Sequence, residues 1–351
     1  MSGPTGASRI LQIHPTRRCN LRCLHCYSSS GPEERGHLSL ALLKAAVTDA
    51  CAEGYTVVSL SGGEPLLYPS LRALLDHAHA CGMHTCVTSN GMLLTPGRLA
   101  SLQGAVDLWA FSLDGVPASH DQMRGSGRAF ELLQSHLPAV RASGVPFGLI
   151  FTLTQHNLHE LDWVATFARA QGARLLQIHP LEEVGRARHL LAGEEPDDTE
   201  RAFAFLESLR LRSETEEGMR VQLDLVRPAQ LRADPDSVFA GEMVGDGGDC
   251  PLADLVSPLV IEADATVTPL QYGFARSYAL GSLQQAPLNA LARAWRQECY
   301  PRFHSLCRQV FAELTSSPDL LFANWYAAVA RQAERETEER ASAGVSRLLP
   351  V

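Results

Sequence analysis

Hydrophobic and polar positions follow two alternating rhythms over the first half of the chain. Short apolar, β-rich runs are separated by longer segments with apolar residues at helical spacing, such as Leu38–Gly54 and Ser70–Gly82. Both segments close on a glycine, which helix C-termini favour. Such strand–helix alternation predicts right-handed βαβ units and a parallel sheet. The six predicted strands are Arg9–Pro15, Thr56–Gly62, His84–Gly91, Asp107–Gly115, Pro146–Thr154 and Arg174–Glu182.

This rhythm breaks after about residue 190. Thr199–Ser213 and Leu320–Ala343 have helical patterns, the second with a charged outer face. Val256–Leu270 alternates like a β-hairpin, and Gly241–Gly248 is rich in Gly and Asp, which predicts a loop or boundary. We therefore expect a barrel domain over 1–190, a helical connector over 191–248 and an extension with C-terminal helices over 249–351.

Composition and charge exclude several classes of protein. The 351 residues are 45% hydrophobic and 20% charged, the usual balance for a globular protein. A net charge of −9 argues against a nucleic-acid or membrane-surface binder. No stretch approaches the ~18 apolar residues that span a bilayer, and residues 1–8 lack the features of a secretory signal. We expect a cytoplasmic protein that binds neither nucleic acid nor membrane.

The nine cysteines point to metal or redox chemistry rather than to disulfides. Cys19, Cys23 and Cys26 form a CxxxCxxC pattern directly after the first predicted strand, so their thiols can converge on one metal centre. Zinc usually takes four protein ligands, and His25 or a distant residue could supply the fourth. Three thiolates also suit a [4Fe–4S] cluster whose fourth iron stays open to an external ligand. Three ordinary buried cysteines are the plainest alternative.

Further motifs follow these cysteines at successive strand ends, and together they make the chain resemble the radical S-adenosylmethionine (SAM) family. The resemblance covers residues 9–190 and keeps the order of the family's motifs. These are Ser61-Gly-Gly-Glu-Pro-Leu-Leu67, Thr88-Ser-Asn-Gly91, Ser112-Leu-Asp-Gly115, His120-Asp121 with Arg124-Gly125, and Gly185-Arg-Ala187. The resemblance implies an α/β fold, a partial (β/α)6 TIM-like barrel with a small α+β C-terminal extension. It also implies that Cys19, Cys23 and Cys26 hold one [4Fe–4S] cluster, whose open iron binds SAM.

The same resemblance assigns SAM contacts residue by residue. Gly62 and Gly63 would let the backbone approach the methionine amino group, because glycine has no Cβ, and Glu64 would accept its protons. Without the resemblance, these residues fit a strand-end turn and a solvated carboxylate. The remaining candidates keep structural alternatives: Asn90 as a SAM contact or a helix cap, Ser112 for the ribose or a strand-end hydroxyl, and Arg124 for the carboxylate or an exposed cation.

Radical SAM chemistry implies reductive cleavage of SAM to methionine and a 5′-deoxyadenosyl radical, which removes a hydrogen atom from the substrate. The electron would come from a small donor such as flavodoxin or ferredoxin. Arg17, Arg18 and Arg22 form a basic patch that suits an acidic donor, or are simply solvated arginines. The sequence assigns no residue that acts directly on the substrate.

The C-terminal third resembles the SPASM or twitch extension of radical SAM enzymes, through its hairpin, Leu280-Gly281 and Trp295. Leu270, however, stands where the second cysteine of that pattern is expected. Cys250, Cys299 and Cys307 remain, one short of a four-cysteine set. We therefore expect a single cluster and an extension that covers the barrel mouth as a substrate lid. Cys51, Cys81 and Cys86 are expected core residues.

Three functions fit these features. The first is maturation of a ribosomally synthesised peptide by a radical SAM enzyme. The second is a radical SAM epimerase, dehydrogenase or decarboxylase acting on a sugar, aminoglycoside or nucleoside intermediate of a natural product. The third is a non-enzymatic iron–sulfur or zinc protein, against which the SAM-binding motifs speak.

Overall fold

The computed structural model describes residues 9–214, 218–243 and 250–346, with side chains up to residue 340. The secretory-signal prediction for residues 1–8 and most of the predicted loop Gly241–Gly248 lie outside these residues. Among the described helices, none is both long enough and apolar enough to cross a membrane.

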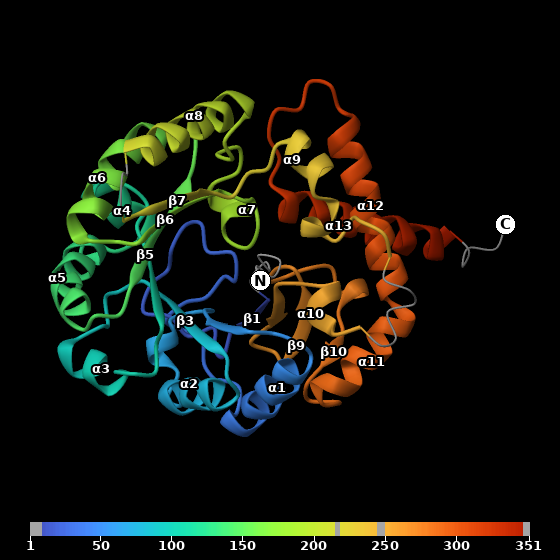
Figure 1. Ribbon diagram of the computed structural model, residues 1–351, viewed down its shortest axis with the longest axis horizontal. Coiled ribbons are helices and arrows are strands. Elements are labelled where there is room, and N and C mark those ends of the chain that lie inside the picture. The colour runs from blue at the N-terminus through green and yellow to red at the C-terminus, as the bar shows by residue number, and fades with distance from the viewer. Residues whose placement is uncertain (1–8, 215–217, 244–249, 347–351) are drawn as a thin grey trace, which may run out of the picture.

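One curved sheet organises the molecule, in the strand order β10-β9-β8-β1-β2-β3-β4-β5-β6-β7. Strands β1 to β7 run parallel, β8 runs parallel to β1, and β9 and β10 are antiparallel additions. The strands form an arc with the helices outside it (Figure 1), so the predicted α/β partial barrel is confirmed. The strands are β1 (Ile10–Ile13), β2 (Val57–Leu60), β3 (His84–Ser89), β4 (Leu108–Ser112), β5 (Phe147–Leu153), β6 (Leu175–Pro180), β7 (Arg220–Leu223), β8 (Leu259–Ile261), β9 (Thr266–Pro269) and β10 (Gly281–Ser282).

The helices alternate with the strands up to β7 and then form a separate group around the C-terminal hairpin (Figure 1). They are α1 (Leu40–Ala52), α2 (Leu71–Ala80), α3 (Pro96–Ser101), α4 (Pro117–Arg124), α5 (Ala129–Ala142), α6 (Leu161–Gln171), α7 (Ala187–Leu190), α8 (Asp198–Glu214), α9 (Pro228–Ala233), α10 (Leu252–Leu255), α11 (Leu288–Glu298), α12 (Tyr300–Ser316) and α13 (Trp325–Ser346).

The segment 191–248, expected to be a helical connector, also contains a strand. After α8, the residues Arg220–Leu223 form β7, which pairs in parallel with β6 and extends the barrel. Four alternating residues are too few to distinguish a strand from a loop by pattern alone, and the pairing partner lies far away in sequence. The connector prediction is therefore incomplete, because 191–248 adds a further helix–strand unit to the sheet.

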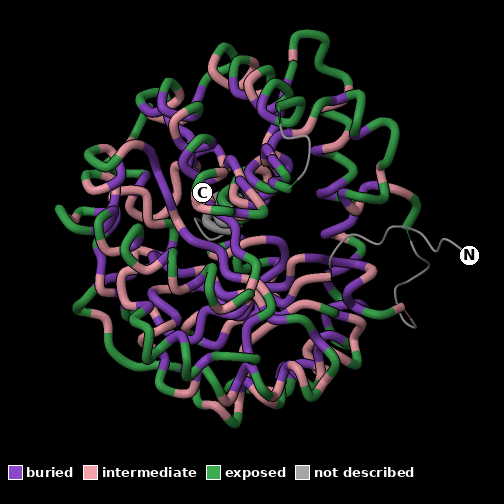
Figure 2. The backbone as a smooth tube through the Cα atoms, turned by 60° about the vertical axis from the view of Figure 1, so that its left-hand side comes forward, coloured by how far each residue is buried: buried purple, intermediate pink, exposed green. Residues whose placement is uncertain are grey.

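The two faces of the parallel strands differ in polarity. In β6, Leu176 and Ile178 are buried in the main hydrophobic core, whereas Gln177 and His179, which alternate with them, are partly exposed. The neighbouring strand β7 repeats this pattern with buried Val221 and Leu223. Figure 2 shows buried residues gathered in the interior of the molecule and exposed residues along its periphery. Because successive side chains of a strand point to opposite faces, polar residues line the concave interior.

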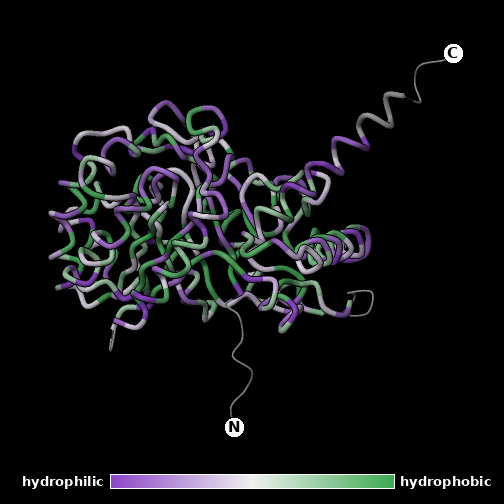
Figure 3. Tube along the Cα trace, turned by 90° about the horizontal axis from the view of Figure 1, so that it is seen from above, coloured by the Kyte–Doolittle hydropathy of each residue, from purple (hydrophilic) through white to green (hydrophobic). Residues whose placement is uncertain are grey.

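The C-terminal extension continues the barrel sheet. Its predicted hairpin is confirmed: β8 and β9 pair antiparallel, with Ala265 in the left-handed conformation (φ 70°) at the turn. Since β8 pairs with β1, the hairpin is attached directly to the first strand. Figure 3 shows a hydrophilic part of the C-terminal helix α13 projecting from one side of the molecule.

Candidate active site

The three motif cysteines lie on one loop that follows β1. Cys19 and Cys23 are buried, Cys26 is partly buried, and Leu21 and Met92 pack with them in a small hydrophobic cluster. Burial raises the pKa of Cys19 to about 12, so the thiol stays protonated unless a cation displaces the proton. No three His, Cys, Asp or Glu side chains among the described residues come close enough to hold a single metal ion. A set of three thiols gathered in one apolar patch fits the larger [4Fe–4S] cluster.

A second loop, after β6, holds the cysteine loop in place. The Arg186 guanidinium donates from Nε to the Cys23 carbonyl oxygen (2.8 Å) and from Nη2 to the Ser30 carbonyl oxygen (2.6 Å). A Cβ on Gly185 would lie 2.5 Å from the Cys26 carbonyl oxygen, so only glycine fits there. The Gly-Arg-Ala motif therefore positions the cysteines from the far side of the barrel.

Gly62 and Gly63 are required by contacts with the cysteine loop. A Cβ on Gly63 would lie 2.2 Å from the Arg18 carbonyl oxygen, and one on Gly62 would lie 2.8 Å from that of Thr16. The backbone N–H of Gly63 donates to the Thr16 carbonyl oxygen (2.9 Å). The close approach allowed by the missing side chains is thus already used within the protein, and the predicted contact with SAM stays a prediction.

Glu64 is fully buried, so its interpretation as a solvated carboxylate is wrong. Its carboxylate accepts hydrogen bonds from the Ser89 hydroxyl (2.9 Å) and from the backbone N–H groups of Asn90 (3.0 Å) and Leu66 (3.1 Å). Burial raises the pKa of Glu64, and these hydrogen bonds oppose the rise. Glu64 thereby joins the end of β2 to the end of β3.

Asn90 connects β3 to the cysteine loop. Its Nδ2 donates to Asn20 Oδ1 (2.9 Å) and lies 4.0 Å from Cys19 Sγ, while its Oδ1 accepts from the Met92 backbone N–H (3.0 Å). Ser112 lies at the end of β4 and is partly exposed. Both residues are therefore at strand ends on the edge that carries the cysteines, and their contacts with SAM stay predictions.

Arg124 is buried at the end of α4, so its interpretation as an exposed cation is wrong. Its Nε forms an ion pair with Asp114 Oδ2 (2.6 Å), and its Nη1 lies 3.8 Å from Cys23 Sγ. His25 and His120 each place a ring nitrogen 3.9 Å from the same carboxylate oxygen. Burial would raise the pKa of Asp114, but Arg124 and the two histidines lower it to about 2.

Asp114 was not singled out by the sequence, although it lies within the Ser-Leu-Asp-Gly motif. The signal available was its position two residues after the β4 end, ten residues before the Arg-Gly motif. Asp114 thus holds the Arg124 guanidinium in place beside the motif cysteine Cys23.

The remaining cysteines lie in unlike surroundings. Cys250 Sγ is 3.9 Å from Asp254 Oδ2, Cys299 Sγ is 3.9 Å from the Tyr278 carbonyl oxygen, and Cys307 is fully buried in the core side of α12. Leu270 is buried with a φ of 64°, a conformation that costs energy for a leucine. The predicted basic patch is partly neutralised, because Arg17 pairs with Glu34 (3.2 Å) and Arg22 with Glu33 (2.5 Å).

Comparison with known proteins finds a matching family model and several similar chains. The family model for the radical SAM superfamily matches residues 13–168. An AdoMet-dependent heme synthase of Methanosarcina barkeri is 30% identical over 201 residues, which cover 56% of each chain. A mycofactocin maturase of Mycobacterium tuberculosis is 34% identical over 187 residues, or 52% of this chain and 46% of the maturase. The chain spans about half the length of these curated relatives.

Solved structures share the fold over most of the chain. SuiB of Streptococcus suis bound to S-adenosylmethionine aligns with a TM-score of 0.63 at 15% identity, covering 88% of this chain and 67% of SuiB. Native anSMEcpe with bound AdoMet aligns with a TM-score of 0.63 at 16% identity, covering 97% of this chain and all of anSMEcpe (100%). The shared fold thus includes the C-terminal region as well as the barrel. The motifs at the expected strand ends and the match over residues 13–168 identify a radical SAM domain in this chain, and enzymes of that superfamily bind a [4Fe–4S] cluster and S-adenosylmethionine.

Proposed function

We propose that this radical SAM enzyme reductively cleaves SAM and removes a hydrogen atom from a ribosomally synthesised peptide. One observation carries the proposal: the loop with Cys19, Cys23 and Cys26 is held against the Gly62–Glu64 turn and Asn90 at one edge of the barrel. This edge is formed by the carboxyl ends of the parallel strands, where barrel enzymes place their active sites.

Cys19, Cys23 and Cys26 would be the three protein ligands of the cluster. When bound, the cluster supplies the electron that splits SAM into methionine and a 5′-deoxyadenosyl radical. The protein's own residues orient the reactants: Arg186 fixes the cysteine loop, and Glu64 fixes the turn beside it. Arg124 places its guanidinium beside Cys23, where a positive charge stabilises a thiolate.

The peptide substrate is supported by relatives and neighbours. A mycofactocin maturase is among the curated relatives, and SuiB is also known bound to its precursor peptide SuiA. A small-molecule substrate is the second candidate, because heme synthases are also among the relatives. We further propose flavodoxin or ferredoxin as the electron donor and a cytoplasmic location.

The test is SAM cleavage by the anaerobically reconstituted protein after dithionite is added. We expect 5′-deoxyadenosine, measured by liquid chromatography, and its deuteration when a deuterated candidate peptide is supplied. Cys23→Ala should lose both the cluster absorbance and the product, whereas Cys81→Ala, at the end of α2, should keep both. Cleavage by Cys23→Ala at the wild-type rate would show that the cluster lies elsewhere.

We also propose that the chain holds a single cluster and that the extension covers the barrel mouth. The test is the iron content of the variant that combines Cys19→Ala, Cys23→Ala and Cys26→Ala. Iron near zero is expected, because Leu270 cannot replace a thiolate and Cys250, Cys299 and Cys307 have different neighbours. About four irons per chain with a cluster signal would reveal an auxiliary cluster.

A further inference from the structure

A group of polar side chains lines the barrel interior at the ends of β6 and β7. This group, here called the β6–β7 cluster, lies outside the motifs that resemble the radical SAM family. Its members are Gln177, His179, Glu182, Gln222 and Asp224. The buried neighbours Leu176, Ile178, Val221 and Leu223 point to the hydrophobic core, so the cluster faces the opposite, concave side.

Asp224 organises the cluster from its centre. Its carboxylate accepts hydrogen bonds from Gln177 Nε2 (2.6 Å), Gln222 Nε2 (2.9 Å) and His179 Nδ1 (3.0 Å). A carboxylate can only accept hydrogen bonds, so both glutamines must turn their NH₂ groups toward it. Their carbonyl oxygens are therefore directed away from Asp224 and are free to accept hydrogen bonds from another molecule.

Glu182 adds a second carboxylate beside His179. Its Oε1 accepts from Asn324 Nδ2 (2.9 Å), just before α13, and lies 3.6 Å from His179 Nε2. The side chain of His179 is 41% exposed, so a small molecule can reach the cluster. Burial lowers the pKa of His179, but its contacts with Asp224 and Glu182 raise it more. The cluster holds two carboxylates and one ionisable base, so its charge is negative in either protonation state of His179.

We infer that the β6–β7 cluster binds a protonated amine of the substrate. Two amide carbonyls and the Glu182 carboxylate form an acceptor-rich, negatively charged face, which complements an ammonium group with its three N–H donors. The sources of such a group are a lysine side chain of a peptide or an amino sugar. The role of the β6–β7 cluster as a substrate site rests on the proposed function, whereas its binding of an amine does not.

The experiment measures binding of small probes to the full chain, labelled with ¹³C at its histidine rings and without reductant. The ring signal of His179 is identified by its loss in His179→Gln. Nα-acetyl-lysine methylamide and 2-deoxystreptamine are the two ammonium probes, and Nα-acetyl-norleucine methylamide and myo-inositol are their neutral counterparts. We expect the His179 signal to shift until it saturates as an ammonium probe is added, with a dissociation constant in the millimolar range. The ammonium probe that binds more tightly identifies the source of the amine.

Matched variants locate the binding group. Glu182→Gln should weaken the binding about tenfold, as expected for one lost charge-assisted hydrogen bond. Glu183→Gln changes the same charge one residue away, where the side chain instead accepts from the Gly193 N–H, and should bind like the wild type. Two results with the wild-type protein would overturn the inference without any variant. The first is a His179 signal that shifts equally with the neutral and the ammonium probes, and the second is a His179 signal that shifts with neither ammonium probe.

The outcome is separable from that of the proposed function. A chain that binds amines but yields no 5′-deoxyadenosine refutes the radical chemistry and leaves the amine site standing. A chain that cleaves SAM but ignores both ammonium probes refutes only the amine site.

Discussion

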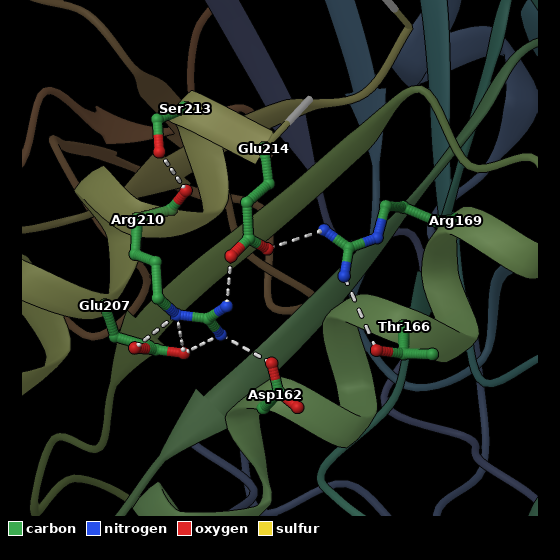
Figure 4. Close-up of polar contacts among 7 residues, drawn as sticks. All are labelled: Asp162, Thr166, Arg169, Glu207, Arg210, Ser213 and Glu214. Carbon is green, nitrogen blue, oxygen red and sulfur yellow. Dashed lines mark hydrogen bonds and ion pairs between the residues drawn. The ribbon is translucent and has the colours of Figure 1, made fainter. Parts of the chain in front are cut away.

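Two arginines of this molecule make ion pairs in opposite surroundings. Arg210, on α8, pairs with three carboxylates: Asp162 on α6 (2.5 Å), Glu214 (2.5 Å) and Glu207 (Figure 4). Among the residues that the structure describes, Arg124 pairs only with Asp114, and these two side chains are only 10% and 0% exposed, against 41% for Arg210. Water and salt screen the exposed network, while the buried pair depends on its single partner. Burial, and not the number of partners, decides which charge the fold depends on.

The largest expected effect comes from removing the buried partner. Asp114→Asn keeps the shape of the side chain but leaves the Arg124 guanidinium without a counter-ion. Breaking a buried pair in this way costs about 3–5 kcal/mol, so the anaerobic thermal unfolding midpoint should fall by several degrees. Asp162→Asn, in the exposed network, is the control and should leave the midpoint unchanged. Equal effects of the two variants would contradict the comparison.

The pH dependence of stability tests the contrast between buried and exposed ionisable groups a second time, with histidines. Burial lowers the pKa of His14 to about 3 and that of His120 to about 4, from 6.5. Below pH 6.5 the unfolded chain therefore binds more protons than the folded one, and stability falls as the pH drops from 6.5 toward 4. The loss is about 1.4 kcal/mol for each pKa unit.

His14→Phe should flatten this slope in urea unfolding at successive pH values. His84→Gln, at a side chain that is 80% exposed, should leave the slope as it is. An unchanged slope in His14→Phe would mean that His14 does not stay neutral in the folded protein.

Glu64 is a buried carboxylate that, unlike Asp114, is held by neutral hydrogen-bond donors instead of a counter-ion. Glu64→Ala should weaken SAM binding by about 1.5–3 kcal/mol, or roughly ten- to a hundredfold in the dissociation constant. The absorbance of the cluster should stay unchanged. Equilibrium titration with SAM measures the dissociation constant. Because Glu64 also holds Ser89 and Asn90, Ser89→Ala serves as the control for the structural part of the effect. A dissociation constant equal to that of the wild type would restrict Glu64 to its structural hydrogen bonds.

The smallest effect is expected at Arg210. Arg210→Ala should leave the unfolding midpoint close to that of the wild type, and added salt should remove the remaining difference because exposed pairs are screened. Thermal unfolding at low and high salt measures this. A loss as large as that of Asp114→Asn would show that α8 depends on its ion pairs for packing against α6.

The sequence predicted the first six strands because each combines a short apolar run with a motif or turn at its end. Strand β7 has neither, and only its pairing with β6 identifies it. The motifs also predicted which strand ends meet, but not how: the contacts of Arg186 with Cys23 and of Glu64 with Ser89 join residues far apart in sequence. Burial of Asp114 and Arg124 could not be predicted either, since charged residues are usually exposed and become buried only when a partner is in place.

The attachment of β8 to β1 has a consequence for the order of events during synthesis. The backbone N–H of Ile10 donates to the hydroxyl of Ser257, 247 residues later, and β1 gains its second neighbour only when β8 has been made. Translation delivers the cysteine loop early and the strand that completes its support late. Contacts between residues so far apart in sequence form slowly, and they form after the local contacts. The nascent chain therefore carries the three motif cysteines on a barrel edge that is still incomplete, where their thiols stay open to oxidation until β8 has been made.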